Sequence, residues 1–235
     1  MKVNEYGCPF CNEFNGKKHL SYFENTIGTR YGINKRCVLE TKNFVSIPSI
    51  GSFVEGYLLI VPRKHFLSFL SMPFHYTEEL NSIITCLSDF YLDCYHSNFV
   101  IFEHGSSSLD NTGGMSVLHA HLHIVPYNSL FISDVKDYHF IKYNKFLVVK
   151  RNYFFRNKQN PYLFFRDIDG VYYYCENENI PSQFFRKRLC NLLGFINMGD
   201  WKEYPFIKNI EKTIVSADSY QLQTKYNKKT GGKYG

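Results

Sequence analysis

The chain has 235 residues, of which 44% are hydrophobic and 20% are charged, and its formal net charge is +6. This composition is typical of a globular protein with a substantial core, and it excludes the disordered, collagen-like and low-complexity classes. The positive charge would favour anionic ligands, but it is too small to indicate a nucleic-acid-binding stripe.

The apolar runs and the cysteines of the chain indicate its cellular compartment. Runs such as residues 57–61 (YLLIV) are far shorter than the roughly 18 residues of a membrane span, and residues 1–5 lack the apolar stretch of a signal peptide. The seven cysteines include one close pair, which is no disulfide framework and is typical of a reducing compartment. We therefore expect a cytoplasmic protein with no membrane partner.

The first part of the chain predicts strands followed by a helix. Residues 37–47 are rich in β-forming side chains, and a Pro-Ser-Ile-Gly-Ser turn separates them from a buried-strand candidate at residues 56–61. We expect these strands to pair as antiparallel neighbours. Apolar side chains then recur at helical spacing over residues 77–97, with Thr77 as the expected N-cap before an acidic first turn.

Two further strands flank a polar loop. The first is expected at residues 98–103, and it leads into a loop rich in Gly, Ser and Asn at residues 104–114. The second is expected at residues 117–125 and is closed by Pro126.

Beyond Pro126 the pattern changes. Residues 161–166 and 171–175 predict a hairpin with a Gly-containing turn. A helix is expected over residues 181–193, with Gly194 as its C′ residue. Residues 225–235, which contain adjacent lysines and three glycines, predict a frayed tail.

Three histidines stand at alternate positions in residues 119–123, which read HAHLH. For a chain with this histidine content, chance produces such an arrangement on the order of once in a hundred chains. Side chains on a strand alternate between faces, so the imidazoles of His119, His121 and His123 should line one face. A catalytic row, a set of hydrogen-bonded core histidines and a metal site are all compatible with this spacing.

The loop before this row suits phosphate binding. Gly105, Gly113 and Gly114 allow backbone N–H groups to approach phosphate oxygens closely, and Ser116 supplies a hydroxyl three residues before His119. Loop flexibility alone would also explain glycines. Their position beside the histidines favours the catalytic interpretation.

Residues 113–125, GGMSVLHAHLHIV, resemble the signature of the histidine triad (HIT) superfamily, in which histidines alternate with apolar residues. Residues 56–65, GYLLIVPRKH, resemble the family's strand that ends in Pro-Lys/Arg-x-His. Residues 8–11, CPFC, resemble the N-terminal CxxC of many bacterial members. The resemblance covers roughly residues 6–130. It implies an α+β protein with a HIT-like antiparallel sheet, a packing helix, and a C-terminal hairpin-and-helix extension.

This resemblance divides the chain into three parts. We expect a HIT-like catalytic domain at residues 1–135, an extension packed on it at residues 136–224 and a flexible tail at residues 225–235. HIT proteins are often dimers, so a homodimer is one alternative for this chain. The extension could instead cover the surface through which HIT proteins dimerise.

Membership of the superfamily implies nucleotidyl transfer, with the middle histidine, His121, attacking the α-phosphorus of a nucleotide anhydride, ester or phosphoramidate. A neutral imidazole has one lone-pair nitrogen and an unperturbed pKa near 6.5, so it can attack without a separate base. His123 and Ser116 would bind the phosphoryl oxygens, and His119 could assist unless it binds a metal. The expected enzyme is a nucleotide hydrolase or nucleotidylyltransferase.

Two other function classes stay open. One is removal of adenylate from a nucleic-acid 5′ end, but the modest net charge argues against a nucleic-acid partner. The other is a noncatalytic nucleotide-binding sensor, which the intact triad argues against. Whether water or another group accepts the nucleotidyl group is also open.

The cysteine pair admits three interpretations: a redox pair, two cysteines that share no ligand, and half of a zinc site. Nothing before Cys8 is long enough to be the strand of a redox βαβ unit. Zinc-bearing HIT proteins take their further ligands from the histidine after the Pro-Arg-Lys strand and from the first triad histidine. The resemblance therefore implies a structural zinc bound by Cys8, Cys11, His65 and His119.

Some positions depart from the HIT pattern. Glu103 and His104 stand in Glu-His-Gly, where many members have Asn-x-Gly, and each could be a ligand contact or a strand-end residue. Ser49 is nearest to the position of the side chain that binds ribose hydroxyls. In the extension, Arg186 could bind a charged leaving group or acceptor, or could belong to a solvated basic face.

Overall fold

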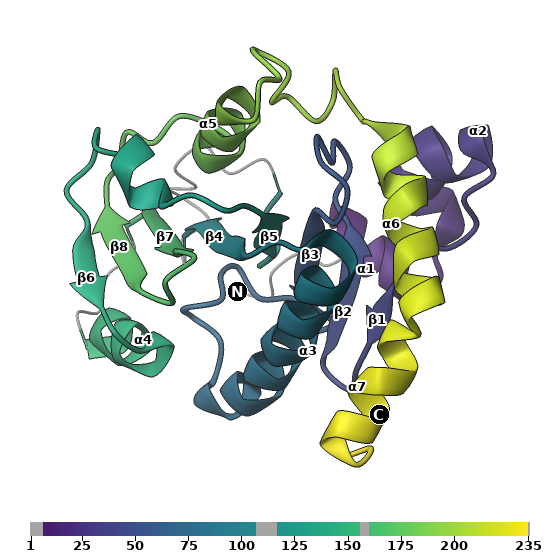
Figure 1. The fold of residues 1–235 in the computed structure, drawn as a ribbon, viewed down its shortest axis with the longest axis horizontal. Coiled ribbons are helices and arrows are strands. Elements are labelled where there is room, and N and C mark those ends of the chain that lie inside the picture. The colour runs from purple at the N-terminus through teal and green to yellow at the C-terminus, as the bar shows by residue number, and fades with distance from the viewer. Residues whose placement is uncertain (1–6, 107–116, 156–159, 235) are drawn as a thin grey trace.

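A computed structural model describes residues 7–106, 117–155 and 160–234 of the chain (Figure 1). Its strands form one eight-stranded sheet in the order β1-β2-β3-β5-β4-β7-β8-β6, and neighbouring strands run antiparallel. The strands are β1 (Leu39–Glu40), β2 (Phe44–Pro48), β3 (Leu58–Pro62), β4 (Phe99–Gly105), β5 (Leu122–Pro126), β6 (Ile141–Tyr143), β7 (Tyr162–Arg166) and β8 (Tyr172–Glu176). The expected α+β class is confirmed.

Helices cover both faces of this sheet. They are α1 (Pro9–Phe14), η2 (Lys18–Leu20), η3 (Glu24–Gly28), α2 (Thr29–Tyr31), η4 (Phe74–Tyr76), α3 (Thr77–Tyr95), η5 (Phe131–Asp134), α4 (Phe146–Phe155), α5 (Phe184–Leu192), α6 (Ile207–Tyr220) and α7 (Leu222–Thr230). Among those that the structure describes, none is long and apolar enough to cross a membrane.

The two faces of the sheet carry separate cores, because successive side chains of a strand point to opposite sides. On one face, α3, α4, α6 and α7 pack over side chains such as Leu58 and Ile60 of β3. On the other face, α1, α5 and η5 pack over Leu59 and Val61 of the same strand. All of β3 is therefore buried, as its uninterrupted apolar sequence requires. Figure 1 shows α3, α6 and α7 lying together along one side of the sheet.

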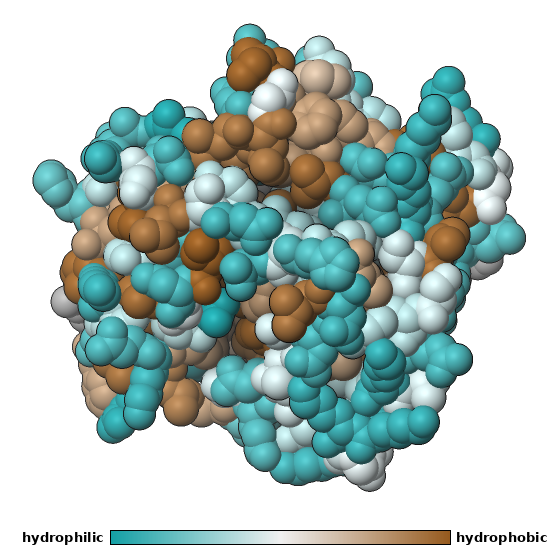
Figure 2. Space-filling view, viewed as in Figure 1, coloured by the Kyte–Doolittle hydropathy of each residue, from teal (hydrophilic) through white to brown (hydrophobic). Residues whose placement is uncertain are grey.

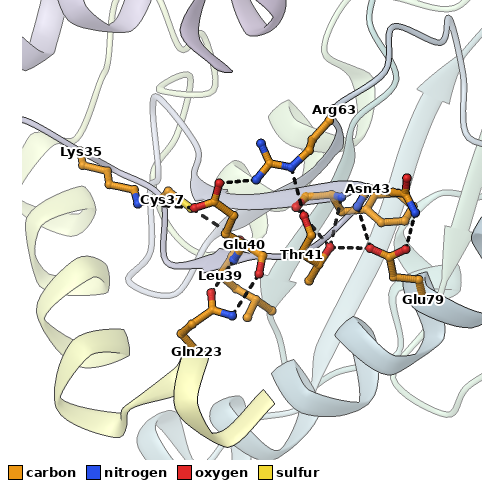
Figure 3. Close-up of polar contacts among 10 residues, drawn as sticks. Lys35, Cys37, Leu39, Glu40, Thr41, Asn43, Arg63, Glu79 and Gln223 are labelled. Atoms are coloured by element: carbon orange, nitrogen blue, oxygen red, sulfur yellow. Dashed lines mark hydrogen bonds and ion pairs between the residues drawn. The ribbon is translucent and has the colours of Figure 1, made fainter. Parts of the chain in front are cut away.

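The segment predicted as one strand at residues 37–47 is instead a hairpin of β1 and β2. Its turn is held by the carboxylate of Glu79 in α3. This group accepts hydrogen bonds from Thr41 Oγ1 at 2.7 Å, from the Asn43 backbone N–H at 2.8 Å and from Asn43 Nδ2 at 2.6 Å (Figure 3). The predicted antiparallel pairing with the next strand is confirmed for β2 and β3.

Helix α3 has the predicted extent but a different start. Thr77 is its first residue rather than its N-cap, because the short 3₁₀ helix η4 runs directly into it. The acidic first turn is present, and one of its carboxylates is the turn-holding Glu79. The helix ends at Tyr95, where His96 adopts a left-handed conformation with φ of 49°.

The C-terminal extension continues the same sheet. β7 pairs with β4 along its length, so strands on both sides of residue 135 belong to one sheet. The predicted hairpin is confirmed as β7 and β8, with Gly170 at φ 82° in its turn. Helix α5 ends as predicted, since Gly194, with φ 86°, directly follows the C-cap.

Residues 225–235 were expected to form a flexible tail, and this prediction is wrong for residues 225–230, which belong to α7. Leu222 and Tyr226 bury their side chains against the core that α3 also contacts. Gln223 exchanges two hydrogen bonds with the backbone of Glu40: its Oε1 accepts the Glu40 N–H at 2.7 Å, and its Nε2 donates to the Glu40 carbonyl at 3.0 Å (Figure 3).

Candidate active site and metal centre

Four ligand-type side chains meet at the start of the chain. Cys8 precedes α1 and Cys11 lies in its first turn, a spacing of three that places both thiols on one side of the helix. Cys8 Sγ lies 3.2 Å from His119 Nδ1, and Cys11 Sγ lies 3.3 Å from His65 Nδ1 and 3.5 Å from His119 Nδ1. All four ligand atoms lie within 4.8 Å of one another. These residues could hold a metal ion.

The surroundings of this cluster favour the binding of a cation. The other ring nitrogen of His119, Nε2, donates to the Pro62 carbonyl at 2.8 Å, which leaves Nδ1 as the coordinating atom. The pKa of the Cys8 thiol is lowered far below its ordinary value, chiefly by hydrogen bonding with Cys11 and further by the two histidines, against the opposing effect of burial. A thiolate is the metal-binding form of cysteine.

The next histidine, His121, is oriented by the backbone. Its Nδ1 donates to the carbonyl of His119 at 2.6 Å, so in the neutral ring the lone pair lies on Nε2. Burial, together with the nearby His119 ring and against the backbone hydrogen bond, lowers the pKa of His121 to about 4. His121 is therefore neutral at physiological pH.

The third histidine, His123, lies within β5 and is held by two aromatic side chains. Its ring stacks on Phe102 of β4 with centroids 4.6 Å apart and planes 9° apart. Its Nδ1 lies 2.6 Å from the hydroxyl of Tyr57. Burial holds the pKa of His123 well below its ordinary range, and electrostatic interaction with His121 and with the Arg186 guanidinium acts in the same direction.

The three imidazoles lie on one face, as expected: their neighbours Cys8, Phe10 and Phe102 belong to one core, whereas Ala120, Leu122 and Ile124 belong to the core on the opposite face. Strand β5 begins only at Leu122, but the alternation of side chains extends back to His119. His119 is fully buried and belongs to the cysteine cluster, whereas His121 and His123 line a cavity. Phe10 separates the two groups, with its ring 5.6 Å from each of the His119 and His121 rings.

This cavity has a volume of about 330 Å³ and collects residues from both ends of the chain. The N-terminal segments supply aromatic and charged side chains, and the extension supplies the opposite wall. The lining residues that the argument uses are Phe23, Arg36, His121, His123, Arg186 and Trp201. Figure 2 shows hydrophobic surface over α5, whose inner side forms part of this wall.

Of the glycines and the serine predicted to bind phosphate, the structure describes Gly105. Gly113, Gly114 and Ser116 lie outside the described residues. Gly105 ends β4 opposite Tyr162, and a Cβ there would lie only 2.4 Å from atoms of the Tyr162 ring. The need for glycine at this position is therefore explained by packing.

Glu103 does not line the cavity, which favours the strand-end interpretation over the ligand contact that the sequence also left open. It points to the opposite face of β4 from Phe102 and is 2% exposed. Its carboxylate accepts hydrogen bonds from the Tyr162 hydroxyl and from the Phe69 backbone N–H. His104, on the same face as Phe102, does line the cavity.

Ser49 and Arg186 are brought together at the cavity wall. Arg186 is 3% exposed, which excludes the solvated basic face that sequence left open for it. Its Nε donates to the Gly199 carbonyl at 2.8 Å, Nη1 to Ser49 Oγ at 3.4 Å and Nη2 to the Gly51 carbonyl. The guanidinium thus joins the extension to the turn between β2 and β3.

Several cavity residues carried no signal in the sequence. Arg36 forms a two-point ion pair with Glu13 at 2.8 and 2.7 Å and lies 4.4 Å from the centroid of the Phe23 ring. Tyr22 and Trp201 meet edge to face at 5.3 Å, which joins the N-terminal and C-terminal walls. Pro9 and Phe10, inside the CPFC motif, and Leu59 and Val117, inside the other two matching segments, also line the cavity.

No protein-family model matches the chain, and no curated protein matches it. Similar solved structures include a HIT family protein from Bacillus anthracis (17% identity, TM-score 0.40, covering 53% of this chain and 75% of that chain). A member of the HIT family from Bacillus subtilis has 15% identity and a TM-score of 0.39, covering 64% and 96%. A Zn-bound histidine triad family protein from Mycobacterium smegmatis has 20% identity and a TM-score of 0.36, covering 54% and 78%. The chain is structurally similar to HIT family proteins at low identity.

Proposed function

We propose that this chain is an enzyme that transfers a nucleotidyl group from a nucleotide anhydride, ester or phosphoramidate through a covalent adduct on His121. The observation that carries the proposal is the hydrogen bond from His121 Nδ1 to the His119 carbonyl at the wall of a cavity. It places the lone pair on Nε2, and burial keeps the ring neutral. Such an imidazole is a nucleophile that needs no separate base.

The reaction balances in two displacements. In the first, His121 Nε2 bonds to the α-phosphorus while the bond from phosphorus to the leaving group breaks, and the leaving group departs with the electron pair. In the second, water or another acceptor loses a proton to the solvent and bonds to phosphorus, and the phosphorus–nitrogen bond breaks with its electron pair returning to His121 Nε2. His123, beside His121 with ring centroids 4.9 Å apart, binds the phosphoryl oxygens on which charge develops.

The cavity suits a nucleotide as the substrate. Aromatic side chains such as Phe23, Phe184 and Trp201 line it and offer surfaces on which a base can stack. Arg186 and Lys202 also line it and, beyond the Arg36–Glu13 ion pair, leave its wall with positive charge, which favours the phosphate groups.

The donor set of the metal centre fits zinc. Two thiols and two imidazole Nδ1 atoms form the Cys₂His₂ set typical of closed structural zinc sites. Zinc there would supply structural cross-linking of α1 to the residues after β3 and before β5. His119 would be committed to this site and would position His121 only through its carbonyl.

The test is a panel of AMP-, GMP- and UMP-containing anhydrides, phosphoramidates and sugar nucleotides, together with a 5′-adenylated oligonucleotide. Products separated by charge identify the substrate class, and mass spectrometry after alkaline quenching detects the nucleotidyl-histidine, whose phosphorus–nitrogen bond is labile in acid. Nucleotide binding without turnover of any substrate would instead support a sensor.

His121→Ala should lower turnover by several orders of magnitude and abolish the adduct while the fold is kept, because the covalent step has no substitute. His75→Ala, at an exposed histidine, is the matched control and should keep full activity. Retention of more than a few per cent of turnover in His121→Ala would reject His121 as the nucleophile.

A further inference from the structure

His121 and His123 both line the cavity, but their Nδ1 atoms have different partners. The partner of His121 is a carbonyl, which can only accept a hydrogen bond. The partner of His123 is the hydroxyl of Tyr57, which can donate or accept. The direction of this second hydrogen bond decides which nitrogen of His123 carries the proton.

The surroundings of Tyr57 make its hydroxyl the donor. Tyr57 is fully buried, and burial raises its pKa to about 12, so the hydroxyl keeps its proton. The Arg186 guanidinium, which can only donate, lies 5.3 Å from the centroid of the Tyr57 ring. Ser49 already donates to the Ile50 carbonyl at 3.1 Å and accepts from Arg186. The lone pair of the His123 Nδ1 atom, 2.6 Å away, is thus the best acceptor for the Tyr57 proton.

We propose that Tyr57 is a positioning residue that holds His123 in the tautomer protonated on Nε2, and that Arg186 of the extension holds Tyr57 in place. The inference rests on the proposed function for its catalytic meaning. The two histidines then have opposite tautomers: His121 presents a lone pair to phosphorus, and His123 presents an N–H to a phosphoryl oxygen.

Arg186 is bound firmly enough for this role. Its three hydrogen bonds reach Gly199, Ser49 and Gly51, and its guanidinium also lies over the Phe53 ring at 5.5 Å. Because these partners already engage the guanidinium at several nitrogens, Arg186 acts on the reaction through Tyr57 and His123. Helix α5 thereby contributes to the orientation of a residue in β5.

The test measures the tautomer directly in the ligand-free protein. Ring-nitrogen chemical shifts from histidine labelled with ¹⁵N distinguish a protonated nitrogen from one with a lone pair, and the signal that disappears in His123→Gln is that of His123. We expect Nε2 protonated and Nδ1 unprotonated in the unmodified protein. A signal with Nδ1 protonated would overturn the proposal without any variant, and it would leave the nucleophile assignment of His121 untouched.

Variants then test the assignment to Tyr57 and Arg186. Tyr57→Phe should leave His123 as a mixture of tautomers and lower kcat about 10- to 100-fold with KM changed less than about threefold. Arg186→Met should also change the tautomer populations of His123 toward a mixture, and Arg186→Lys should change them less. An unchanged His123 signal in folded Tyr57→Phe or Arg186→Met protein would overturn the role of that residue.

Tyr174→Phe is the matched control. Tyr174 of β8 is also buried, and its hydroxyl donates to Glu176 Oε1 at 2.7 Å on the other face of the sheet. Loss of that hydroxyl should leave the His123 signal and kcat unchanged. An equal response in both variants would mean that Tyr57 acts only through stability, which overturns the positioning role.

Discussion

Glu103 is a buried carboxylate with buried neighbours. It is 2% exposed and accepts hydrogen bonds from Tyr162 and from the Phe69 backbone. Lys150 of α4, also 2% exposed, donates to the carbonyl of the same Phe69 at 3.0 Å. Burial raises the pKa of Glu103 to about 7 and lowers that of Lys150 to about 8. The two groups thus hold the backbone of Phe69 from both sides, its N–H through Glu103 and its carbonyl through Lys150.

The raised pKa of Glu103 makes stability depend on pH. A carboxyl with a pKa of about 7 in the folded state and 4.5 in the unfolded state contributes stability that is complete below pH 4.5 and is lost as pH rises through 7. We expect Glu103→Gln to reduce the fall in unfolding free energy over this range by on the order of 3 kcal/mol. Urea titrations at several pH values measure it.

The control for this experiment is Glu178→Gln, the same change at an exposed site. It should leave the pH dependence as in the unmodified protein. If Glu103→Gln and the unmodified protein lose stability in parallel between these pH values, Glu103 is not the responsible group.

Helix α1 is short, and its position depends on contacts that surround its two thiols. Six residues are too few for a stable isolated helix, so tertiary contacts must hold it. The cysteine and histidine cluster provides them, together with the packing of Phe10 against two imidazoles.

We expect the purified protein to carry close to one equivalent of zinc. The double variant Cys8→Ser with Cys11→Ser should lose it and should lower the melting temperature by about 5 °C or more, because metal binding contributes directly to folding. Metal analysis and calorimetry measure the two effects. Cys94→Ser, at an exposed cysteine, should keep the metal. If the purified protein contains no metal and the double variant has an unchanged melting temperature, the interpretation that Cys8 and Cys11 share no ligand is supported.

At the other end of the chain, α7 is anchored by few side chains. Tyr226 is fully buried between α3 and β1, whereas most of its neighbours in the helix are polar and exposed. Tyr226→Ala should therefore cost about 3 kcal/mol of unfolding free energy, as for other large-to-small changes in cores. Chemical denaturation measures it, and exposed Lys228→Ala should change it by less than about 0.5 kcal/mol. Equal small effects would mean that this helix is frayed in solution.

Over the whole molecule, features encoded by neighbouring residues could be predicted from the sequence. The HxHxH and CxxC patterns and the hairpin around Gly170 are local, and the structure contains each of them. Helix α6 also had a usable signal, because Ile207, Ile210 and Ile214 recur at helical spacing, but this signal was missed.

Features that depend on distant partners could not be predicted. The division of β1 from β2 depends on Glu79, and the burial of Arg186 depends on carbonyls of Gly51 and Gly199. No local pattern indicates such partners. The same reason explains why Tyr57 and Trp201 were not expected in the site.

The pairing of β4 with β7 has a consequence for how the protein is synthesised. Tyr162 follows Glu103 by 59 residues, so β4 leaves the ribosome with one edge unpaired until β7 is made. At about 5–20 residues per second, this takes roughly 3–12 s, during which the nascent chain offers an open strand edge to other chains. Arg186 follows Gly51 by 135 residues, so the wall that it forms is added later still. A ribosome that stalls between these two points would hold the complete histidine motif within an unfinished cavity.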